Sequence, residues 1–295
     1  MSVLIQCLVS GIMIGTVYTL VAVGFVLIYK SSGVLNFAQG ELLLLGAYVC
    51  WSSIVQFHIP IWASFLIVII YGLVLGLLIE RLILRPLIGQ SLIVIIMMTI
   101  GLSFILRGIV LLIWGSKTQA FPRELFPGED LQIGGLSLPP QQVWSFAIAA
   151  VLVIALILAF RYTRAGLAMR AAAEDQLASQ ASGVRVSTVF AQTWIVSALV
   201  AAVGGILLGS LSTISLHLSE MGLKVFPVII GGGLESILGA VICGPLVGIL
   251  ETLGDVYIGQ YVGGYVSEVL PYIFLVLVLI IKPYGLFGLA QIRRI

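Results

Sequence analysis

Three strongly polar side chains stand close together at the start of an apolar run, residues 33–48, GVLNFAQGELLLLGAY. They are Asn36, Gln39 and Glu41. Polar and ionisable groups inside a membrane are costly, and they usually face a bundle interior or a water-filled cavity. Their chemistry is hydrogen bonding and charge pairing. They could therefore line a polar pathway or hold neighbouring helices together, and the sequence leaves both roles open.

Three further charged residues lie in or near apolar runs: Arg107, Glu251 and Asp255. Arg107 lies eight residues before Gly115, which places it roughly 12 Å from the end of its run at the rise of an α-helix. These groups could belong to a polar pathway or form ion pairs that fix helix packing. For Arg107 we favour the ion pair.

The common catalytic signatures are absent from the sequence. It contains no G-x-x-x-x-G-K-[ST] phosphate loop, no H-E-x-x-H motif and no G-x-S-x-G motif. Its three cysteines are isolated within apolar runs, which favours small buried side chains over a metal site or a disulfide framework. We predict no catalytic residue, no metal site and no enzyme activity.

The elements that must position these residues are membrane helices. Of the 295 residues, 61% are hydrophobic and only 9% are charged, with a mean hydropathy of +1.22. A soluble domain carries about 25% charged residues. The net charge of +2 is too weak to suggest a nucleic-acid partner. The composition predicts an all-α, polytopic integral membrane bundle that forms one transmembrane domain over residues 1–295.

Eight apolar runs approach the length of about 20 residues that a spanning helix needs. They are 3–29, 33–52, 61–80, 91–115, 142–160, 188–211, 237–256 and 267–282. Residues 222–235, GLKVFPVIIGGGLE, contain a proline and three successive glycines and are too short for a full span. Such broken or half-length elements occur where protein or a water-filled cavity surrounds them.

The orientation follows from the lysines and arginines, which concentrate on the cytoplasmic side. One arrangement places ten of them inside and three outside, with Arg107 within a span. The ten are Lys30, Arg81, Arg85, Arg161, Arg164, Arg170, Arg185, Lys282, Arg293 and Arg294. This predicts an external N-terminus and an internal C-terminus. Eight full spans would leave both termini on the same side of the membrane. Residues 222–235 must therefore supply one further crossing.

Two polar segments join the predicted spans. Residues 116–141 are expected to form a periplasmic loop with a short hairpin at Leu131–Leu138 around Gly134 and Gly135. Residues 161–187 are expected to be cytoplasmic.

The cytoplasmic segment contains AMRAAAEDQLASQA (168–181), a strong helix former that we expect to break at Gly183 before the next span. Arg170 and Glu174 lie at i and i+4, on one side, with Asp175 next to them. This short helix could dock into a groove on a partner protein or serve as a solvated connector.

Glycines mark a second region, GGGLESILGAVICG (231–244). Three consecutive glycines break a helix, and Glu235-Ser236 directly after them resembles a helix N-terminus. Residues 234–241, LESILGAV, faintly repeat the pattern of GELLLLGAY at 40–48, which makes the two regions candidate partners at one pathway. Small residues of two runs are expected to pack closely against other helices; they are Gly11, Gly15, Gly24, Gly239, Gly244 and Gly248.

Three stretches, in order, resemble the permease family of branched-chain amino acid ABC importers of the LivH type. The first is GTVYTLVAVGFVLIYKSSGVLNFAQGELLLLGAY (15–48), the second RAAAEDQLASQASGV (170–184) and the third GGGLESILGAVICG. The resemblance covers about residues 1–290. It implies a multi-pass subunit of a bacterial inner membrane that binds no cofactor of its own. The implied partners are a homologous second permease or a second copy, two cytoplasmic ATP-binding subunits that carry ATP and magnesium, and a periplasmic substrate-binding protein.

The resemblance also implies roles for particular residues. The segment that couples to the ATPases would include Arg170, Glu174, Asp175 and Gly183. Candidates for the translocation pathway are Asn36, Phe37, Gln39, Gly40, Glu41, Gly232, Gly233 and Glu235. Gln39 stands where the family often has histidine, which argues against a proton relay at that position.

We therefore expect a permease that works by alternating access, powered by partner ATPases. Its solute would be a branched-chain amino acid or a related molecule such as urea, an amide or an aromatic acid. An alternative is an ion- or proton-coupled secondary transporter, in which Glu41 and Glu251 would form the coupled carboxylates. A third possibility is a structural or regulatory membrane subunit without a pathway.

Overall fold

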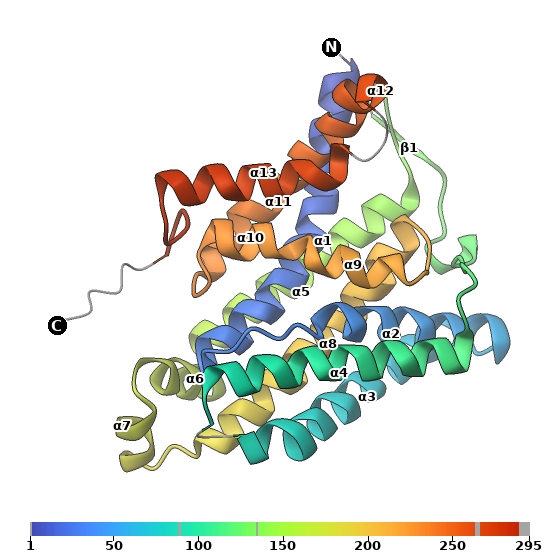
Figure 1. The fold of residues 1–295 in the computed structure, drawn as a ribbon. Helices are drawn as coiled ribbons and strands as arrows, with labels where there is room; N and C mark the ends of the chain where they lie inside the picture. Colours follow the sequence, from blue (N-terminus) through green and yellow to red (C-terminus); the bar gives the residue numbers. More distant parts are fainter. Residues whose placement is uncertain (1, 88–89, 134, 263–265, 289–295) are drawn as a thin grey trace. The chain divides into compact units, whose positions relative to one another are not determined.

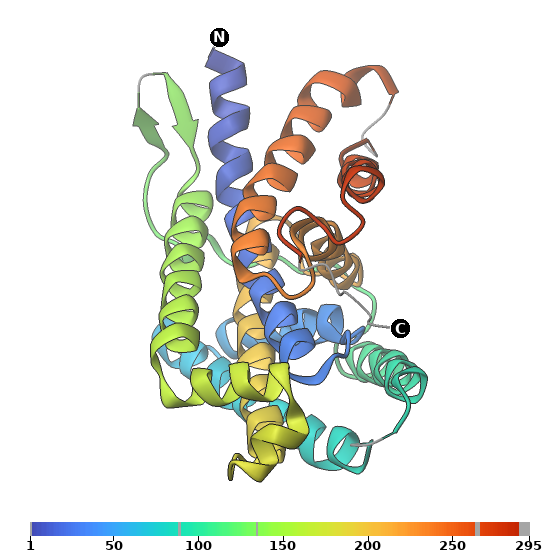
Figure 2. The same cartoon turned by 90° about the vertical axis from the view of Figure 1, so that its left-hand side faces the viewer.

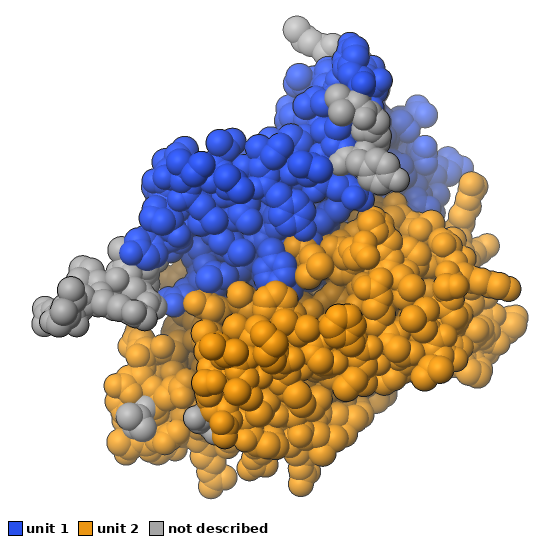
Figure 3. Space-filling view, viewed as in Figure 1, with its two compact units in different colours: residues 1–26, 126–151, 224–295 blue, residues 27–125, 152–223 orange. Residues whose placement is uncertain are grey.

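The computed structural model describes residues 2–87, 90–133, 135–262 and 266–288, and it is almost entirely helical. The predicted hairpin residue Gly134 and the predicted cytoplasmic residues Arg293 and Arg294 lie outside the described part of the chain. The chain forms two compact units, coloured separately in Figure 3. Unit 1 comprises Met1–Val26, Phe126–Val151 and Lys224–Ile295, and unit 2 comprises Leu27–Leu125 and Leu152–Leu223. Helices α1 (Ser2–Ser32) and α5 (Pro140–Tyr162) contribute to both units.

Unit 2 contains seven further α-helices of the described chain, both long and short (Figure 1). They are α2 (Gln39–Trp51), α3 (Ile61–Ile79), α4 (Leu92–Trp114), α6 (Arg164–Glu174), α7 (Gln176–Ala181), α8 (Val186–Leu211) and α9 (His217–Leu223). Helix α2 continues into a π-helical turn at Ser52–Gln56, and α3 into another at Glu80–Leu84. Helices α2 and α3 both pack against α8, and α2 also packs against α9.

Close backbone contact explains the packing of α2 on α8. A Cβ atom built on Gly46 would lie 2.6 Å from the carbonyl oxygen of Ala202, and one built on Gly205 would lie 2.7 Å from the carbonyl carbon of Leu43. Between membrane helices, small residues of this kind let backbones approach and gain van der Waals contact. Helix α2 is consequently almost fully buried, although it is shorter than a normal span.

Unit 1 contains the C-terminal helices, with α13 packed on α10 and α11 (Figure 1). They are α10 (Val225–Gly232), α11 (Ile237–Leu253), α12 (Gly259–Val262) and α13 (Val266–Ile281). The predicted close packing of glycines is confirmed between α1 and α11. A Cβ atom on Gly15 would lie 2.6 Å from Pro245 Cα, and one on Gly248 would lie 2.7 Å from Gly15 Cα.

The predicted spans agree with the observed helices in type, and partly in length. Among the described residues, six helices are long and apolar enough to cross a membrane: Val3–Ser32, Ile61–Leu87, Leu92–Trp114, Pro140–Tyr162, Val186–Leu211 and Ile237–Tyr261. The predicted spans 33–52 and 267–282 correspond to the shorter helices α2 and α13. Residues 33–38 are not helical, because α2 begins only at Gln39.

The expected broken element, residues 222–235, contains the end of α9 (His217–Leu223), the short helix α10 and the turn that follows it. Helix α10 extends through Gly231 and Gly232, and the break falls at Gly233, whose φ of +104° favours glycine. Ser236 begins α11, as expected, because its hydroxyl oxygen accepts a hydrogen bond of 3.0 Å from the Gly239 amide. The orientation in the membrane and the single-domain organisation remain predictions.

The predicted hairpin is present as β1 (Leu131–Ile133) and β2 (Leu136–Leu138), which pair antiparallel. It precedes α5 and lies beside the N-terminal part of α1 (Figure 2). Gln6 Nε2 donates a hydrogen bond of 3.2 Å to the Ser137 carbonyl oxygen. The hairpin is thereby attached to the rest of unit 1.

The expected cytoplasmic segment is helical, but it forms two helices, α6 and α7, that lead from the end of α5 to α8 (Figure 2). The prediction of one continuous helix up to Gly183 was wrong at Asp175, which ends α6 in an extended conformation. The Asp175 carboxylate instead accepts a hydrogen bond of 2.9 Å from the Ala178 amide and begins α7. The expected break at Gly183 is confirmed, with φ at +89°.

Candidate functional site

The polar stretch before α2 is a turn built by its own side chains. Asn36 Oδ1 accepts a hydrogen bond of 3.1 Å from the Ala38 amide, and Asn36 Nδ2 donates one of 3.1 Å to Gln39 Oε1. Asparagine commonly stabilises turns in this way, by bonding to the backbone two residues on. Asn36 therefore stabilises the turn that precedes α2, and it is completely buried within unit 2.

Gln39 connects α2 to α8. Its Nε2 donates to Ser197 Oγ at 3.0 Å and lies 3.3 Å from the Ser197 carbonyl oxygen. Its Oε1 accepts from Asn36, so the amide acts as donor and acceptor at once. Gln39 is completely buried. The bracing role that the sequence left open is present for Asn36 and Gln39, while their contact with a solute remains a prediction.

Replacement of Gln39 by leucine is expected to lower the free energy of unfolding by about 1–3 kcal/mol, because it leaves Ser197 and Asn36 without a buried partner. The measurement is an SDS titration of the detergent-solubilised protein. Gln192→Leu is the matched control, since Gln192 is exposed on the same helix α8. Equal stability of the two variants would contradict the bracing role.

Glu41 follows two residues after Gln39, on another side of α2, and its carboxylate is less well satisfied. It is only 6% exposed, and its Oε2 has no hydrogen-bond partner among the described residues. The nearby polar groups that act on its carboxylate are Ser219, Arg107 and Glu220. A buried acceptor without a donor is costly, so Glu41 is the least satisfied polar group of the Asn36–Glu41 cluster.

Two glycines bring α9 to Glu41. A Cβ atom on Gly222 would lie 2.6 Å from Gly40 Cα, and a Cβ atom on Gly40 would collide with the Ser219 carbonyl oxygen. The backbones of α2 and α9 therefore touch directly beside Glu41. Gly40 thus has a packing function at the candidate site, while Phe37 lies half-buried in the preceding turn.

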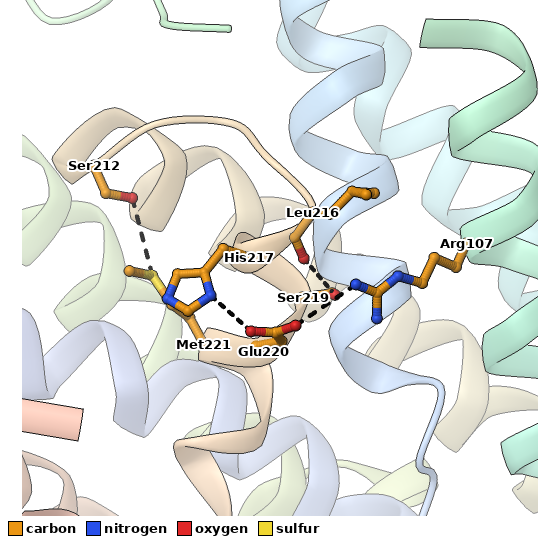
Figure 4. A network of polar contacts seen from close by, with 7 residues as sticks. All are labelled: Arg107, Ser212, Leu216, His217, Ser219, Glu220 and Met221. Atoms are coloured by element: carbon orange, nitrogen blue, oxygen red, sulfur yellow. Dashed lines mark hydrogen bonds and ion pairs between the residues drawn. The ribbon is translucent and has the colours of Figure 1, made fainter. Parts of the chain in front are cut away.

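Arg107, Glu220 and His217 form a network around the same end of α9 (Figure 4). Arg107 Nη2 lies 3.6 Å from Glu220 Oε1, and the side chains are 35% and 49% exposed. His217 Nδ1 lies 2.6 Å from Glu220 Oε2. The ion pair expected for Arg107 is present, but it is loose and half-exposed. Neither Glu220 nor His217 was predicted as a site residue, because both lie outside the predicted spans.

The candidates of the second region, Gly232, Gly233 and Glu235, lie in unit 1. A Cβ atom on Gly232 would lie 2.5 Å from the carbonyl carbon of Gly239, so α10 and α11 turn tightly upon each other. Glu235 is half-buried within this turn. The observed role of the two glycines is close packing, and a shared pathway with Asn36–Glu41 remains a prediction.

Unit 1 contains a second ion pair, one of the two roles that the sequence left open for Glu251, with Lys224 as a partner that the sequence did not indicate. Lys224 Nζ lies 2.8 Å from Glu251 Oε1, and the Tyr18 hydroxyl donates a hydrogen bond of 2.7 Å to Glu251 Oε2. The side chains of Lys224 and Glu251 are only 9% and 15% exposed. Both carboxylate oxygens of Glu251 are therefore occupied within unit 1.

The segment predicted to couple to ATPases presents one face outward. Arg170 does not contribute to it, because its guanidinium bonds the Phe160 carbonyl oxygen and stacks over the Phe160 ring at 5.5 Å. The helical spacing that places Arg170 and Glu174 on one side is present in α6, but the Arg170 side chain is engaged by Phe160 while Glu174 is exposed. Glu174 and Asp175 are exposed, and so is Leu167, which is 60% exposed.

The opposite face of α6 is buried. Met169 and Ala172 pack against Val189 of α8, and Thr163 begins the helix by accepting a hydrogen bond of 3.0 Å from the Gly166 amide. Leu167 was missed because a single leucine in an Ala-rich helix carries no distinct signal. Its exposure emerges only from the packing of α6 on α8.

Comparison with known proteins gives a consistent result. Residues 7–281 match the family model described as the permease component of branched-chain amino acid transport systems. The chain is 31% identical to the high-affinity branched-chain amino acid transport permease BraD of Pseudomonas aeruginosa, over 99% of this chain and 98% of BraD. It is likewise 31% identical to LivH of Escherichia coli K12, over 99% and 97% of the two chains.

A more distant match comes from an archaeon. The probable branched-chain amino acid transport permease LivH of Methanocaldococcus jannaschii is 30% identical, over 95% of this chain and 91% of that protein. Among solved structures, a chain of PsaBC from Streptococcus pneumoniae in complex with Fab has a TM-score of 0.53 at 15% identity, covering 97% of this chain and 94% of that one. This last likeness concerns the fold alone.

Proposed function

The chain belongs to the family of permease components of branched-chain amino acid transport systems, and from this premise we propose how it works. It is a multi-pass membrane permease of an ABC importer. Its solute is a branched-chain amino acid or a closely related small molecule, which crosses the inner membrane by alternating access. ATP hydrolysis takes place on partner subunits, since the sequence contains no phosphate loop.

The outward face of α6 is the observation that carries this proposal. Leu167 and Glu174 lie seven residues apart, on one side of the helix, and both are exposed. The buried residues Met169 and Ala172 fix the other side to α8. An amphipathic helix held rigidly in this way suits insertion into a hydrophobic groove of a partner, with its apolar residue as the anchor. The partner is an ATP-binding subunit, one of two in the assembly.

The attachment of α6 to α8 provides a route by which movements of the ATP-binding subunits reach the permease. When ATP binding moves the partner subunits, a force on α6 passes to α8 through Met169, Ala172 and Val189. Helix α8 in turn packs against α2, which carries Gln39 and Glu41. A movement at the ATPase can thus reach the polar residues of unit 2 through packed helices. A second permease chain and an external substrate-binding protein complete the assembly.

Replacement of Leu167 by aspartate is expected to reduce ATP-dependent uptake of L-leucine at least about 10-fold. The reason is that interface anchors typically contribute 2 kcal/mol or more, and each 1.4 kcal/mol is a factor of ten. Uptake is measured in proteoliposomes that contain the assembled importer, together with retention of the ATP-binding subunits during purification.

Leu131→Asp is the matched control, because Leu131 is also an exposed leucine but lies on the β-hairpin. It should leave retention of the ATP-binding subunits unchanged. Normal uptake and normal retention in Leu167→Asp would contradict the role of α6. Uptake by the wild-type chain alone, without ATP or partners, would overturn the importer and favour the secondary transporter.

The structure gives that secondary transporter little support at Glu251. The alternative needs Glu41 and Glu251 as coupled carboxylates, free to exchange a proton or an ion. Glu251 is held by the Lys224 ammonium and the Tyr18 hydroxyl, so both of its carboxylate oxygens already have partners. Of the two carboxylates that this alternative needs, only Glu41 has an oxygen without a partner among the described residues.

A further inference from the structure

We propose that Glu41 and Arg107 form a solute site that binds an amino acid as its zwitterion. The ammonium group of the solute binds the Glu41 carboxylate, and its carboxylate binds the Arg107 guanidinium. The inference rests on the proposed function, which it deepens, because it assigns the charge pattern that the permease itself recognises. It concerns only residues of unit 2.

The Glu41 carboxylate has one acceptor oxygen that no described residue uses. Its Oε2 is buried and has no donor among the described residues. Ser219 hydrogen-bonds the same carboxylate, but its one hydroxyl also lies 2.8 Å from the Leu216 carbonyl oxygen and carries no positive charge (Figure 4). An ammonium group carries three donors and a positive charge, so it is a suitable partner for this carboxylate.

Arg107 also has spare capacity. Its distance of 3.6 Å to Glu220 is longer than a hydrogen bond, and its side chain is partly exposed. A guanidinium group has five donors arranged as a fork that matches a carboxylate. If a solute carboxylate displaces Glu220 from Arg107, Glu220 keeps its contact with His217 at 2.6 Å. The exchange therefore leaves no carboxylate without a partner.

The charged groups of this site suit the ammonium group of a solute better than a metal ion. Among the residues that the structure describes, no three His, Cys, Asp or Glu side chains gather closely enough to hold a metal. Glu41 and Arg107 carry opposite charges, as the two ends of an amino acid do. Because Glu41 is covered while Arg107 is half-exposed, the solute carboxylate would meet Arg107 first. The ammonium group reaches Glu41 when α9 moves.

The test measures binding of radiolabelled L-leucine by equilibrium dialysis to the purified importer without its substrate-binding protein. Glu41→Gln should weaken binding about 10-fold or more, since a charged hydrogen bond is lost while the shape is kept. Arg107→Lys should also weaken binding, because lysine keeps the charge but not the fork. Leucinamide and 4-methylpentanoate, which each lack one of the two charges, should compete poorly.

Glu129→Gln is the control, because Glu129 is an exposed glutamate of the loop before the hairpin. It should bind L-leucine as the wild type does. A purely structural role of Glu41 would alter the thermal midpoint of Glu41→Gln without altering its leucine affinity, and that result overturns the proposal. Equal competition by either analogue does so too.

Uptake by the wild-type importer in proteoliposomes distinguishes a failure of the zwitterion site from a failure of the proposed function. If the wild-type importer takes up L-leucine with ATP, but the permease binds no leucine or Glu41→Gln binds it normally, only the zwitterion site is wrong. If the wild-type importer takes up no branched-chain amino acid, the proposed function itself fails.

Discussion

Replacement of Lys224 by methionine is expected to lower the free energy of unfolding by about 3–5 kcal/mol, because it strands a buried carboxylate. Lys224 Nζ lies 2.8 Å from Glu251 Oε1, and both side chains are largely buried. Methionine keeps much of the length of the lysine chain, so packing changes little while the charge disappears. Glu251 would retain only the hydrogen bond from Tyr18. The measurement is an SDS titration of the detergent-solubilised protein.

The double variant Lys224→Met/Glu251→Gln provides the control. It removes both charges, and buried ion pairs are often replaced by neutral groups at little cost. It should therefore recover most of the stability that Lys224→Met loses. Tyr18→Phe should cost less than Lys224→Met, about 1.5–3 kcal/mol, because it removes one hydrogen bond to a charged group. If Lys224→Met is as stable as the wild type, this pair does not hold α1, α10 and α11 together.

Replacement of Gly205 by alanine is expected to separate α2 from α8 and to destabilise the protein by about 1–3 kcal/mol or more. The added methyl group would lie 2.7 Å from the carbonyl carbon of Leu43 and would collide with its oxygen. These are backbone atoms, so no side-chain rotation relieves the clash. Since α2 carries Gln39 and Glu41, uptake should fall together with stability. Both are measured on the assembled importer.

Helix α4 offers a matched control for this substitution. A Cβ atom on Gly101 or Gly108 would meet nothing within 4 Å. Alanine has the higher helix propensity, by about 1 kcal/mol, so Gly101→Ala should be neutral or stabilising. The same substitution is thus expected to lower the free energy of unfolding at Gly205 but not at Gly101. A Gly205→Ala variant with unaltered stability would show that the α2 and α8 backbones do not approach this closely.

Much of the architecture could be predicted from the sequence, because its signals are local. Apolar runs predicted the membrane helices, and Gly233 and Ser236 predicted the break before α11. The turn at Gly183 and the hairpin at Leu131–Leu138 followed from residue types at short spacing. The family could be predicted too, since each of the three stretches that resemble it is a continuous run of residues. The comparisons confirm the family.

The candidate site depended on contacts between distant parts of the chain. The sequence showed that Asn36, Gln39 and Glu41 are polar and near the membrane, but not that the first two are satisfied and the third is not. That difference arises because α8 supplies Ser197 to Gln39, while α9 brings the charged Glu220 beside Glu41.

A bundle of membrane helices with a broken element can be predicted from the sequence alone, because hydropathy and helix breaking act within a few residues. The pairing of the charged side chains, by contrast, depends on how the helices pack. Lys224 pairs with Glu251, Arg107 lies beside Glu220, and Arg170 turns to Phe160. A buried charge pairs with the group that helix packing places within a few ångströms of it. Close contacts between glycines set that packing.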